Sequence, residues 1–388
     1  MIRRIKIFCI IALVLSLFSC KDCITEPSED DKFDLRNITR NEAEIESNAD
    51  IDIDSEGNVH IIYQNSGPAN SPTFHTNPSD IYYIYNMNKG KWSKPVNISN
   101  SDNISYDPHM VMDSKDNIHV VWRELGTGEG RTFYNMKHSD GDWKEPIPLT
   151  DDNGDQPRID VDGFDNVHVV AATTTDSKPE FLHLVKFNDI WNITIVDHYI
   201  SNHSLFVTQN GGAHLAFEYG RSIAYNHNNY DNKWNEAELL TTTSDYLKYP
   251  WVHDIAVSDE GNVYVIWCEA HTNQIKFRIK YTESTWSETD SIPNMEGDPW
   301  YPKIAVDENG LHVVWIAYTK EWDYDVYYQK LSHNGIWSER QQISLTETAS
   351  LITAIKLKDN VLHIVWHEKY GSASSSERDV FYTTILTN

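Results

Sequence analysis

The stretch Gly57-Asn58-Val59-His60-Ile61-Ile62-Tyr63 joins a tight turn to a short apolar run through a small apolar residue and a histidine. The pattern returns at 116–122, 165–170, 211–217, 261–267, 309–315 and 360–366, with Tyr264 in place of the histidine once. The separations between the His or Tyr positions are 59, 49, 46, 50, 48 and 51 residues. A repeat of this length built from strands and turns is typical of a β-propeller.

Each repeat contains four strand-like segments separated by turn residues. In the first copy they are the alternating segment 51–54, the His-bearing segment 59–63, the aromatic segment 81–85 and the segment 95–99 that follows Trp92. Period-2 alternation, turn punctuation and β-branched or aromatic enrichment predict a four-stranded antiparallel sheet for each unit. We therefore predict an all-β fold, a seven-bladed β-propeller, over residues 33–388.

The seventh repeat lacks a fourth strand. Its third strand is expected at 380–385, and the sequence ends at Asn388. At the other end, residues 33–39 match residues 92–99 apart from one deleted position. We expect this N-terminal strand to close the last blade, because closure removes sheet edges that invite aggregation. The prediction is one cooperative domain without an internal boundary.

The Trp-bearing turns carry a family resemblance. Ser139-Asp140-Gly141-Asp142-Trp143 and Ser332-His333-Asn334-Gly335-Ile336-Trp337 resemble degenerate Asp-boxes of the sialidase-like repeat propellers. The resemblance extends over essentially the whole mature chain and implies the fold, in a group that contains hydrolases, lyases and lectins. The architecture also resembles the seven-bladed lyases of uronic-acid polysaccharides such as ulvan. In those enzymes arginine neutralises the uronate carboxylate, and histidine or tyrosine moves the protons.

The first residues read as a targeting segment. Arg3, Arg4 and Lys6 precede the short apolar run 7–18, as in a signal peptide. The run ends in Leu17-Phe18-Ser19-Cys20, which resembles a bacterial lipobox and implies cleavage before Cys20 and lipidation of its thiol. An ordinary signal peptide with an incidental cysteine is the alternative.

On this interpretation residues 1–19 are a lipoprotein signal peptide. Residues 20–32 are the lipidated cysteine and a polar, acidic, flexible tether. The expected location is the bacterial outer membrane, lipid-anchored and facing the periplasm or the cell surface.

The charge balance limits the partners. The formal net charge is −26, so the protein should repel nucleic acid and anionic lipid, and the lipid anchor is its only expected membrane contact. An anionic ligand could bind only at a local basic site. We expect a monomer without a cofactor.

The repeated histidines suggest a metal site, but their equivalence argues against one. Symmetry places one in each blade, too far apart to converge on one ion, so we assign them to packing or turn hydrogen bonds. The acidic turns are too short for calcium loops, and Asx-turn chemistry explains them. We predict no metal site.

Function is expected where the repeats disagree. The position four residues before the first turn is polar in every repeat and nearly always different, while its neighbour remains apolar. Around the ring this position reads Asp50, His109, Arg158, Ser204, Asp254, Lys303 and Thr353. Just before it lie residues such as Asp107, His203, Trp251, His253, Trp300 and Tyr301. A variable polar ring beside an apolar one predicts the mouth of a propeller channel.

The ends of the second strands add polar residues to the same face. They include Arg123, Tyr219, Arg221, His367 and Lys369. Placement on this face is the basis for assigning roles. The predicted catalytic residues are His109, His203, Tyr219 and His253. The predicted substrate-binding residues are Arg123, Arg158, Arg221, Trp251, Trp300, Tyr301, Lys303 and His367. Interblade ion pairs are the alternative explanation for any single one of these residues.

Two functions of different classes fit this chemistry. The first is β-elimination on a uronic-acid-containing, possibly sulfated, polysaccharide or oligosaccharide, by a lyase or a dehydratase. Arginine would clamp the carboxylate and His or Tyr would transfer protons. The second is a non-catalytic, lectin-like lipoprotein of a polysaccharide-utilisation system. A sialidase fits less well, because those enzymes have six blades and no Tyr–Glu nucleophile pair is found. A scaffold role is a further alternative.

Overall fold

The computed structural model describes most of the chain. The described residues are 35–39, 44–68, 79–86, 91–126, 130–151, 153–175, 178–197, 200–228, 233–241, 250–269, 272–282, 284–295, 297–320, 323–344, 350–369 and 378–387. Cys20, the predicted signal peptide and the predicted tether lie outside them. The chain divides into the units Met1–Asp34 and Leu35–Asn388. The described residues contain no helix long and apolar enough to cross a membrane.

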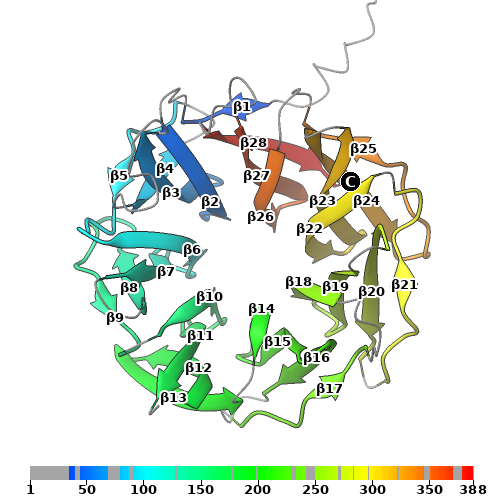
Figure 1. The fold of residues 1–388 in the computed structure, drawn as a ribbon, viewed down its shortest axis with the longest axis horizontal. Helices are drawn as coiled ribbons and strands as arrows, with labels where there is room; N and C mark the ends of the chain where they lie inside the picture. The colour runs from blue at the N-terminus through cyan, green and yellow to red at the C-terminus, as the bar shows by residue number, and fades with distance from the viewer. Residues whose placement is uncertain are drawn as a thin grey trace, which may run out of the picture. The chain divides into compact units, whose positions relative to one another are not determined.

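Every regular element in the described residues of the second unit is a β-strand, and the strands form seven blades around a ring (Figure 1). Blade 1 contains β2 (Glu44–Ile53), β3 (Val59–Pro68), β4 (Asp80–Asn86) and β5 (Val96–Asn97). Blade 2 contains β6 (Ile104–Met112), β7 (Ile118–Leu125), β8 (Arg131–Lys137) and β9 (Ile147–Pro148). Blade 3 contains β10 (Asp155–Val161), β11 (Val167–Thr175), β12 (Lys178–Phe187) and β13 (Ile190–Asp197).

The remaining blades repeat this order. Blade 4 contains β14 (Ser201–Val207), β15 (Ala213–Tyr219), β16 (Ser222–His227) and β17 (Glu238–Leu239). Blade 5 contains β18 (Pro250–Val257), β19 (Val263–Glu269), β20 (Gln274–Lys280) and β21 (Asp290–Ser291). Blade 6 contains β22 (Asp298–Asp307), β23 (Gly310–Lys320), β24 (Asp323–Ser332) and β25 (Gln341–Gln342). Blade 7 contains β26 (Ser350–Lys358), β27 (Val361–Lys369), β28 (Arg378–Leu386) and the N-terminal β1 (Arg36–Asn37). The predicted all-β, seven-bladed propeller is confirmed.

Closure occurs as the sequence predicts. β1 pairs antiparallel with β28, with Arg36 opposite Tyr382 and Asn37 opposite Phe381. The Asn37 side-chain amide donates to Asp379 at 2.6 Å. A parallel bridge between Ile45 and Arg378 also joins blade 7 to blade 1. The sequence repeat did not indicate this second connection.

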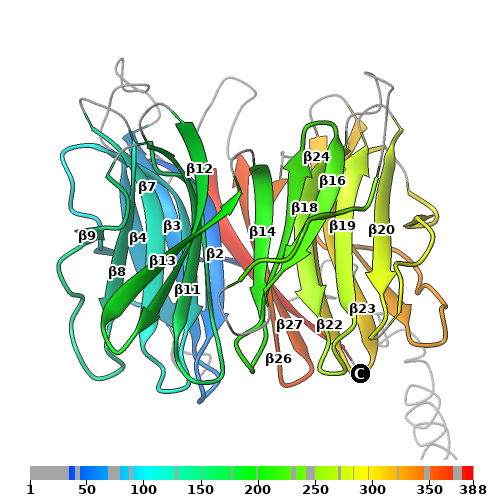
Figure 2. The same cartoon turned by 90° about the horizontal axis from the view of Figure 1, so that it is seen from below.

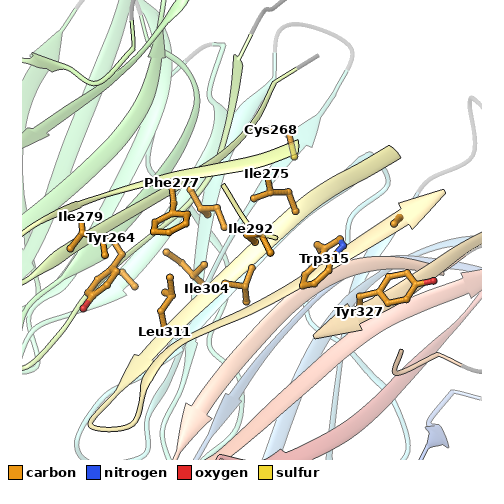
Figure 3. Close-up of a cluster of buried hydrophobic side chains, with 14 residues drawn as sticks. Tyr264, Cys268, Ile275, Phe277, Ile279, Ile292, Ile304, Leu311, Trp315 and Tyr327 are labelled. Atoms are coloured by element: carbon orange, nitrogen blue, oxygen red, sulfur yellow. The ribbon is translucent and has the colours of Figure 1, made fainter. Parts of the chain in front are cut away.

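Neighbouring blades are held by a packed aromatic contact that recurs around the ring. Trp143 of blade 2 meets Tyr83 of blade 1 edge-on, with ring centroids 5.2 Å apart. The equivalent pairs are Trp191–Tyr134, Trp234–His183, Trp286–Tyr225, Trp337–Phe277 and Trp92–Tyr382. Apolar clusters fill the space between blades, and Figure 3 shows the one between blades 5 and 6, with Phe277, Ile304 and Trp315. The recurring tryptophans are therefore structural.

Carboxylates on the innermost strands also connect neighbouring blades, through hydrogen bonds to backbone N–H groups. Asp50 and Asp52 of β2 accept hydrogen bonds from the backbone N–H groups of Met110 and Met112 in β6, each at 2.9 Å. Further bonds of this kind join Val207 N–H to Asp160 at 2.6 Å and Ile304 N–H to Asp254 at 2.9 Å. Because an innermost strand has an unpaired edge, these carboxylates satisfy backbone donors that would otherwise lack a partner.

The repeated histidines have partners within their own blades. His119 Nδ1 lies 2.8 Å from the Tyr134 hydroxyl, and its Nε2 lies 3.3 Å from Asp113. His60, His214, His312 and His363 pair with a tyrosine in the same way, and His168 pairs with His183. This arrangement confirms that these histidines serve hydrogen bonding and packing.

The closure also contains an ionisable group that makes stability depend on pH. Glu46 of β2 is 2% exposed, and burial followed by the charges of Asp379 and Glu44 raises its pKa to about 8. The unfolded value is about 4.5. Glu46 therefore stays protonated in the folded state, and unfolding releases its proton between these two values. Stability should fall as pH rises through this window, by up to about 1.4 kcal/mol per pH unit.

Glu46→Gln removes this ionisation, since glutamine remains neutral. We expect the variant to melt close to the parent at pH 5 and several degrees above it at pH 8, measured by thermal denaturation in matched buffers. Glu56→Gln, in an exposed turn, is the control. If Glu46→Gln raised the melting temperature by the same amount at pH 5 and pH 8, the raised pKa of Glu46 would not be the cause.

Candidate active site

A β-bulge in the innermost strand of every blade positions the candidate residues. In blades 1 to 6 the pairing register shifts just before the variable polar position, for example between Tyr106 and His109 and between Asp155 and Arg158. In blade 7 the shift falls at Thr353 itself, and Ala354 follows it. The bulge residues Asn48, Asp107, Gln156, Asn202 and Tyr301 have φ between 36° and 52°. Bulges re-aim the side chains that follow them. Three of the variable residues that follow a bulge, His109, Arg158 and Lys303, line one cavity at this end of the ring.

These bulges surround a cavity of about 640 Å³. Its lining includes eight of the predicted residues, namely His109, Arg158, His203, Trp251, Trp300, Tyr301, Lys303 and His367. Residues that the sequence analysis did not assign also line it: Asn48, Ala49, Asp107, Pro108, Asn202, Leu351 and Arg378. All seven blades contribute to the lining, and the cations, imidazoles and aromatic rings come from blades 2 to 7.

On the side of blades 2 and 3, a carboxylate connects a histidine and an arginine. Arg158 Nη1 donates to Asp107 at 3.2 Å and to the carbonyl of Pro157 at 2.7 Å. His109 Nδ1 lies 3.2 Å from Asp50, and its Nε2 lies 3.6 Å from Asp107. Although burial opposes ionisation of Asp107, Arg158 and His109 lower its pKa. Asp107 is therefore a carboxylate that contacts both Arg158 and His109.

His203 of β14 is the buried imidazole of this side. It is 4% exposed, packs edge-on against Phe181 at 4.5 Å, and has no well-formed hydrogen bond at either ring nitrogen. Burial, with the nearby charge of Arg158, lowers its pKa well below the usual range, although the charge of Asp107 and the backbone of Gln156 oppose this shift. His203 is thus a neutral imidazole with a nitrogen lone pair available to accept a proton.

Blades 5 and 6 supply an aromatic wall. The rings of Trp251 and Trp300 lie 4.9 Å apart at 31°, and Tyr301 follows at 6.4 Å from Trp300. Tyr301 is 49% exposed and has φ +50°. A bulky side chain rarely adopts this conformation, and such strain concentrates at functional sites. The wall offers apolar faces suited to stacking on a sugar ring.

Blades 6 and 7 supply the remaining polar groups, Lys303, His367 and Arg378. Sequence analysis found Lys303 in the variable ring and His367 at a second-strand end. It missed Arg378, which begins β28 opposite Lys369 of β27. The starts of third strands lie beside the ends of second strands, so a comparison of third-strand starts between repeats would have indicated this arginine.

Three predicted residues are not brought to the cavity. Arg123 pairs with Asp155 at 2.7 Å and lies over the ring of Tyr106, as the interblade ion-pair alternative expects. Tyr219, at the end of β15, is 44% exposed and packs edge-on against Phe217. Arg221 lies in the connection between β15 and β16. Neither Tyr219 nor Arg221 lines the cavity.

The backbone of His253 belongs to β18, but its side chain lies outside the described residues. Among the described residues, no group of three His, Cys, Asp or Glu side chains is arranged to hold a metal ion. Cys268 of β19 is a buried free thiol, and burial raises its pKa.

No family model and no curated protein matches the sequence. Solved structures do match it. An ulvan lyase of polysaccharide lyase family PL25 superimposes with a TM-score of 0.63 at 12% identity, covering 87% of this chain and 93% of the lyase. A protein of unknown function from Dyadobacter fermentans gives 0.52 at 11% identity, covering 90% and 98%. A sialidase from Streptococcus pneumoniae gives 0.50 at 12% identity, covering 89% and 68%. At these identities the likeness concerns the fold.

Proposed function

We propose that this protein is a carbohydrate-active enzyme that cleaves a uronic-acid-containing polysaccharide or oligosaccharide by β-elimination. The observation that carries the proposal is the meeting of Arg158, His109 and His203 in one cavity beside an aromatic wall. A uronate α-proton is too weakly acidic to leave unaided. The reaction therefore needs a cation at the carboxylate and groups that accept and donate protons.

Each group has a place in this reaction. The guanidinium of Arg158 binds the uronate carboxylate through nitrogens other than Nη1, which already donates to Asp107. His203 takes the C5 proton, and the electrons of that C–H bond form the C4–C5 double bond. The C4–O bond then breaks, and the leaving oxygen takes a proton from His109. A lyase releases a sugar in this step, and a dehydratase releases water. Tyr219 receives no role.

Two structural neighbours support a carbohydrate substrate. One is the ulvan lyase in complex with -[GlcA(1-4)Rha3S]-, matched with a TM-score of 0.61 at 12% identity over 84% of this chain and 90% of the lyase. The other is the streptococcal sialidase. Both neighbours are enzymes that act on carbohydrates. For this chain the class of reaction rests on the cavity itself.

A glycan-binding protein without catalysis is the second candidate. Arg158 and His109 already have carboxylate partners, and an aromatic wall with fixed cations is sufficient to bind a sugar. To distinguish the two, the mature protein is incubated with ulvan, alginate, pectate and glycosaminoglycans. Ultraviolet absorbance reports unsaturated uronate, and calorimetry reports binding. Binding without any unsaturated product would favour the lectin over the enzyme.

We also propose that Cys20 carries a lipid that holds the protein at the outer membrane, on the basis of the lipobox-like sequence. Cys20→Ala should move nearly all the protein from the membrane fraction to the soluble fraction, because one side chain provides the anchor. Fractionation and immunoblotting of cells expressing each form measure this, with Cys268→Ala as control. Equal membrane association of Cys20→Ala and parent would contradict the proposal.

A further inference from the structure

The cavity has a second cationic side that the proposed chemistry does not use. Lys303 of β22 and Arg378 of β28 both line it. In the described part of the chain, neither has a carboxylate within ion-pair distance. Some other cations of the protein have such a partner, for example Lys276 with Glu269 at 2.7 Å, and others, such as Arg278, donate to backbone carbonyls. With 58 acidic against 32 basic residues, an unpaired cation is not explained by a shortage of carboxylates.

Arg378 is half-buried, and burial lowers the pKa of its guanidinium. A guanidinium removed from water without a partner costs free energy that a bound anion would recover. Arginine also presents a planar fork of donors that fits a carboxylate or a sulfate. The arrangement of Arg378 is therefore suited to an anion that comes from outside the chain.

His367 is an independent observation at the same place. It is 4% exposed, lines the cavity, and neither of its ring nitrogens has a hydrogen-bond partner. Burial, with the charge of Arg378, lowers its pKa to about 3. The imidazole is neutral, so it offers one N–H donor beside the guanidinium. Buried polar groups are normally hydrogen-bonded, and one left open in a cavity indicates a ligand.

We infer that Arg378, Lys303 and His367 form a second anion-binding subsite, which takes a sulfate or carboxylate on the sugar next to the one that reacts. This inference rests on the proposed function for assigning the reacting uronate to Arg158. Around the ring, blade 1 separates the two cationic sides on one path, and the aromatic wall of blades 5 and 6 lies on the other path. A glycan with anionic groups on adjacent sugars would contact both sides, while a ring face of the glycan stacks on the wall.

The test uses three tetrasaccharides: one from native ulvan, its chemically desulfated form, and tetragalacturonate. Calorimetry measures Kd in a His203→Gln background, so that turnover does not consume the ligand. Arg378→Gln should raise Kd about 10–100-fold for ligands whose second anionic group occupies the subsite. The desulfated ligand, which lacks that group, should change less than about threefold. A loss limited to native ulvan identifies sulfate, and a loss with tetragalacturonate identifies carboxylate.

The matched control is Arg340→Gln, which makes the same charge change at an arginine lying over Tyr327 and outside the cavity lining. Because the backbone of Arg378 bridges to Ile45, Lys303→Gln is the second test variant; it alters the subsite away from the closure. Lys303→Gln should weaken binding of the same ligands as Arg378→Gln and leave binding of the desulfated ligand nearly unchanged.

Three results would overturn the inference. They are unchanged affinity in both subsite variants, equal losses for sulfated and desulfated ligands with no loss for tetragalacturonate, and no binding of any of the three ligands. Turnover by the protein with its native His203, together with Arg378-independent binding, would leave the proposed function standing without the subsite. Arg378-dependent selective binding without turnover would leave the subsite standing without the lyase.

Discussion

A truncated protein that begins at residue 40 should melt roughly 5–10 °C below one that begins at residue 21. The deletion removes β1 and, with it, the side chain of Ile38, which is 6% exposed. Burial of one such side chain is worth about 1.5–3 kcal/mol. The deletion also opens the edge of β28 and takes the Asn37 amide from Asp379, which is 2% exposed. A buried carboxylate without that donor costs roughly 1–3 kcal/mol more.

The control is a protein that begins at residue 33, which lacks the predicted tether but keeps β1. It should melt with the parent. Differential scanning calorimetry of the three forms measures the effect and shows whether unfolding remains a single transition. If the forms beginning at residues 33 and 40 melt together, β1 does not stabilise the ring.

The fold could be predicted from the sequence because its repeats encode the packing. Tyr83 packs against Trp143 of the next blade. The same repeat spacing along the chain therefore places both the strands of each blade and the aromatic residues that pack between blades. The matching of residues 33–39 to the fourth strand of other repeats identified the closure. The bridge between Ile45 and Arg378 could not be predicted, because it joins the two segments where the repeat is broken.

The candidate site was predictable in part, for a physical reason. Residues of the innermost strand, such as Arg158, follow a bulge that recurs in every blade, so their position in the repeat predicted three members of the cavity lining. Asp50, Ser204 and Asp254 hold the same position, but their side chains bond to a neighbouring blade and do not line the cavity. Residues at the ends of second strands, such as Tyr219, depend on the length and course of the following loop, which differ between blades. Arg123 forms an ion pair with Asp155 of the next blade. The sequence of a single repeat does not reveal a pairing between strands of different blades.

The largest effect on activity is expected at His203. His203→Gln keeps a polar side chain of similar length but removes the imidazole that accepts the C5 proton. Loss of a proton-transfer group typically costs about 10²–10⁴-fold in rate. We expect kcat to fall by this amount while oligosaccharide binding changes little, as measured by unsaturated-uronate absorbance and calorimetry on a substrate identified from the panel.

The pH dependence of kcat/KM separates a catalytic role of His203 from a structural one, because a residue that only stabilises the fold would not set the acid limb. Since burial lowers the pKa of His203 well below its usual range, the imidazole stays neutral, and able to accept a proton, at acidities that would protonate an exposed histidine. The acid limb of kcat/KM for the parent should therefore lie well below pH 6.5. The residual activity of His203→Gln should not show this limb.

His312→Ala is the matched control, because His312 is a buried histidine that pairs with the Tyr328 hydroxyl at 2.9 Å inside blade 6, away from the cavity. Its loss should lower the melting temperature and leave kcat of the folded protein within about twofold, since it touches no reacting group. Equal kcat losses in His203→Gln and His312→Ala would indicate that both substitutions lower activity by destabilising the fold. Full turnover in His203→Gln would remove His203 as the base, and the proton acceptor would then have to be another group of the cavity.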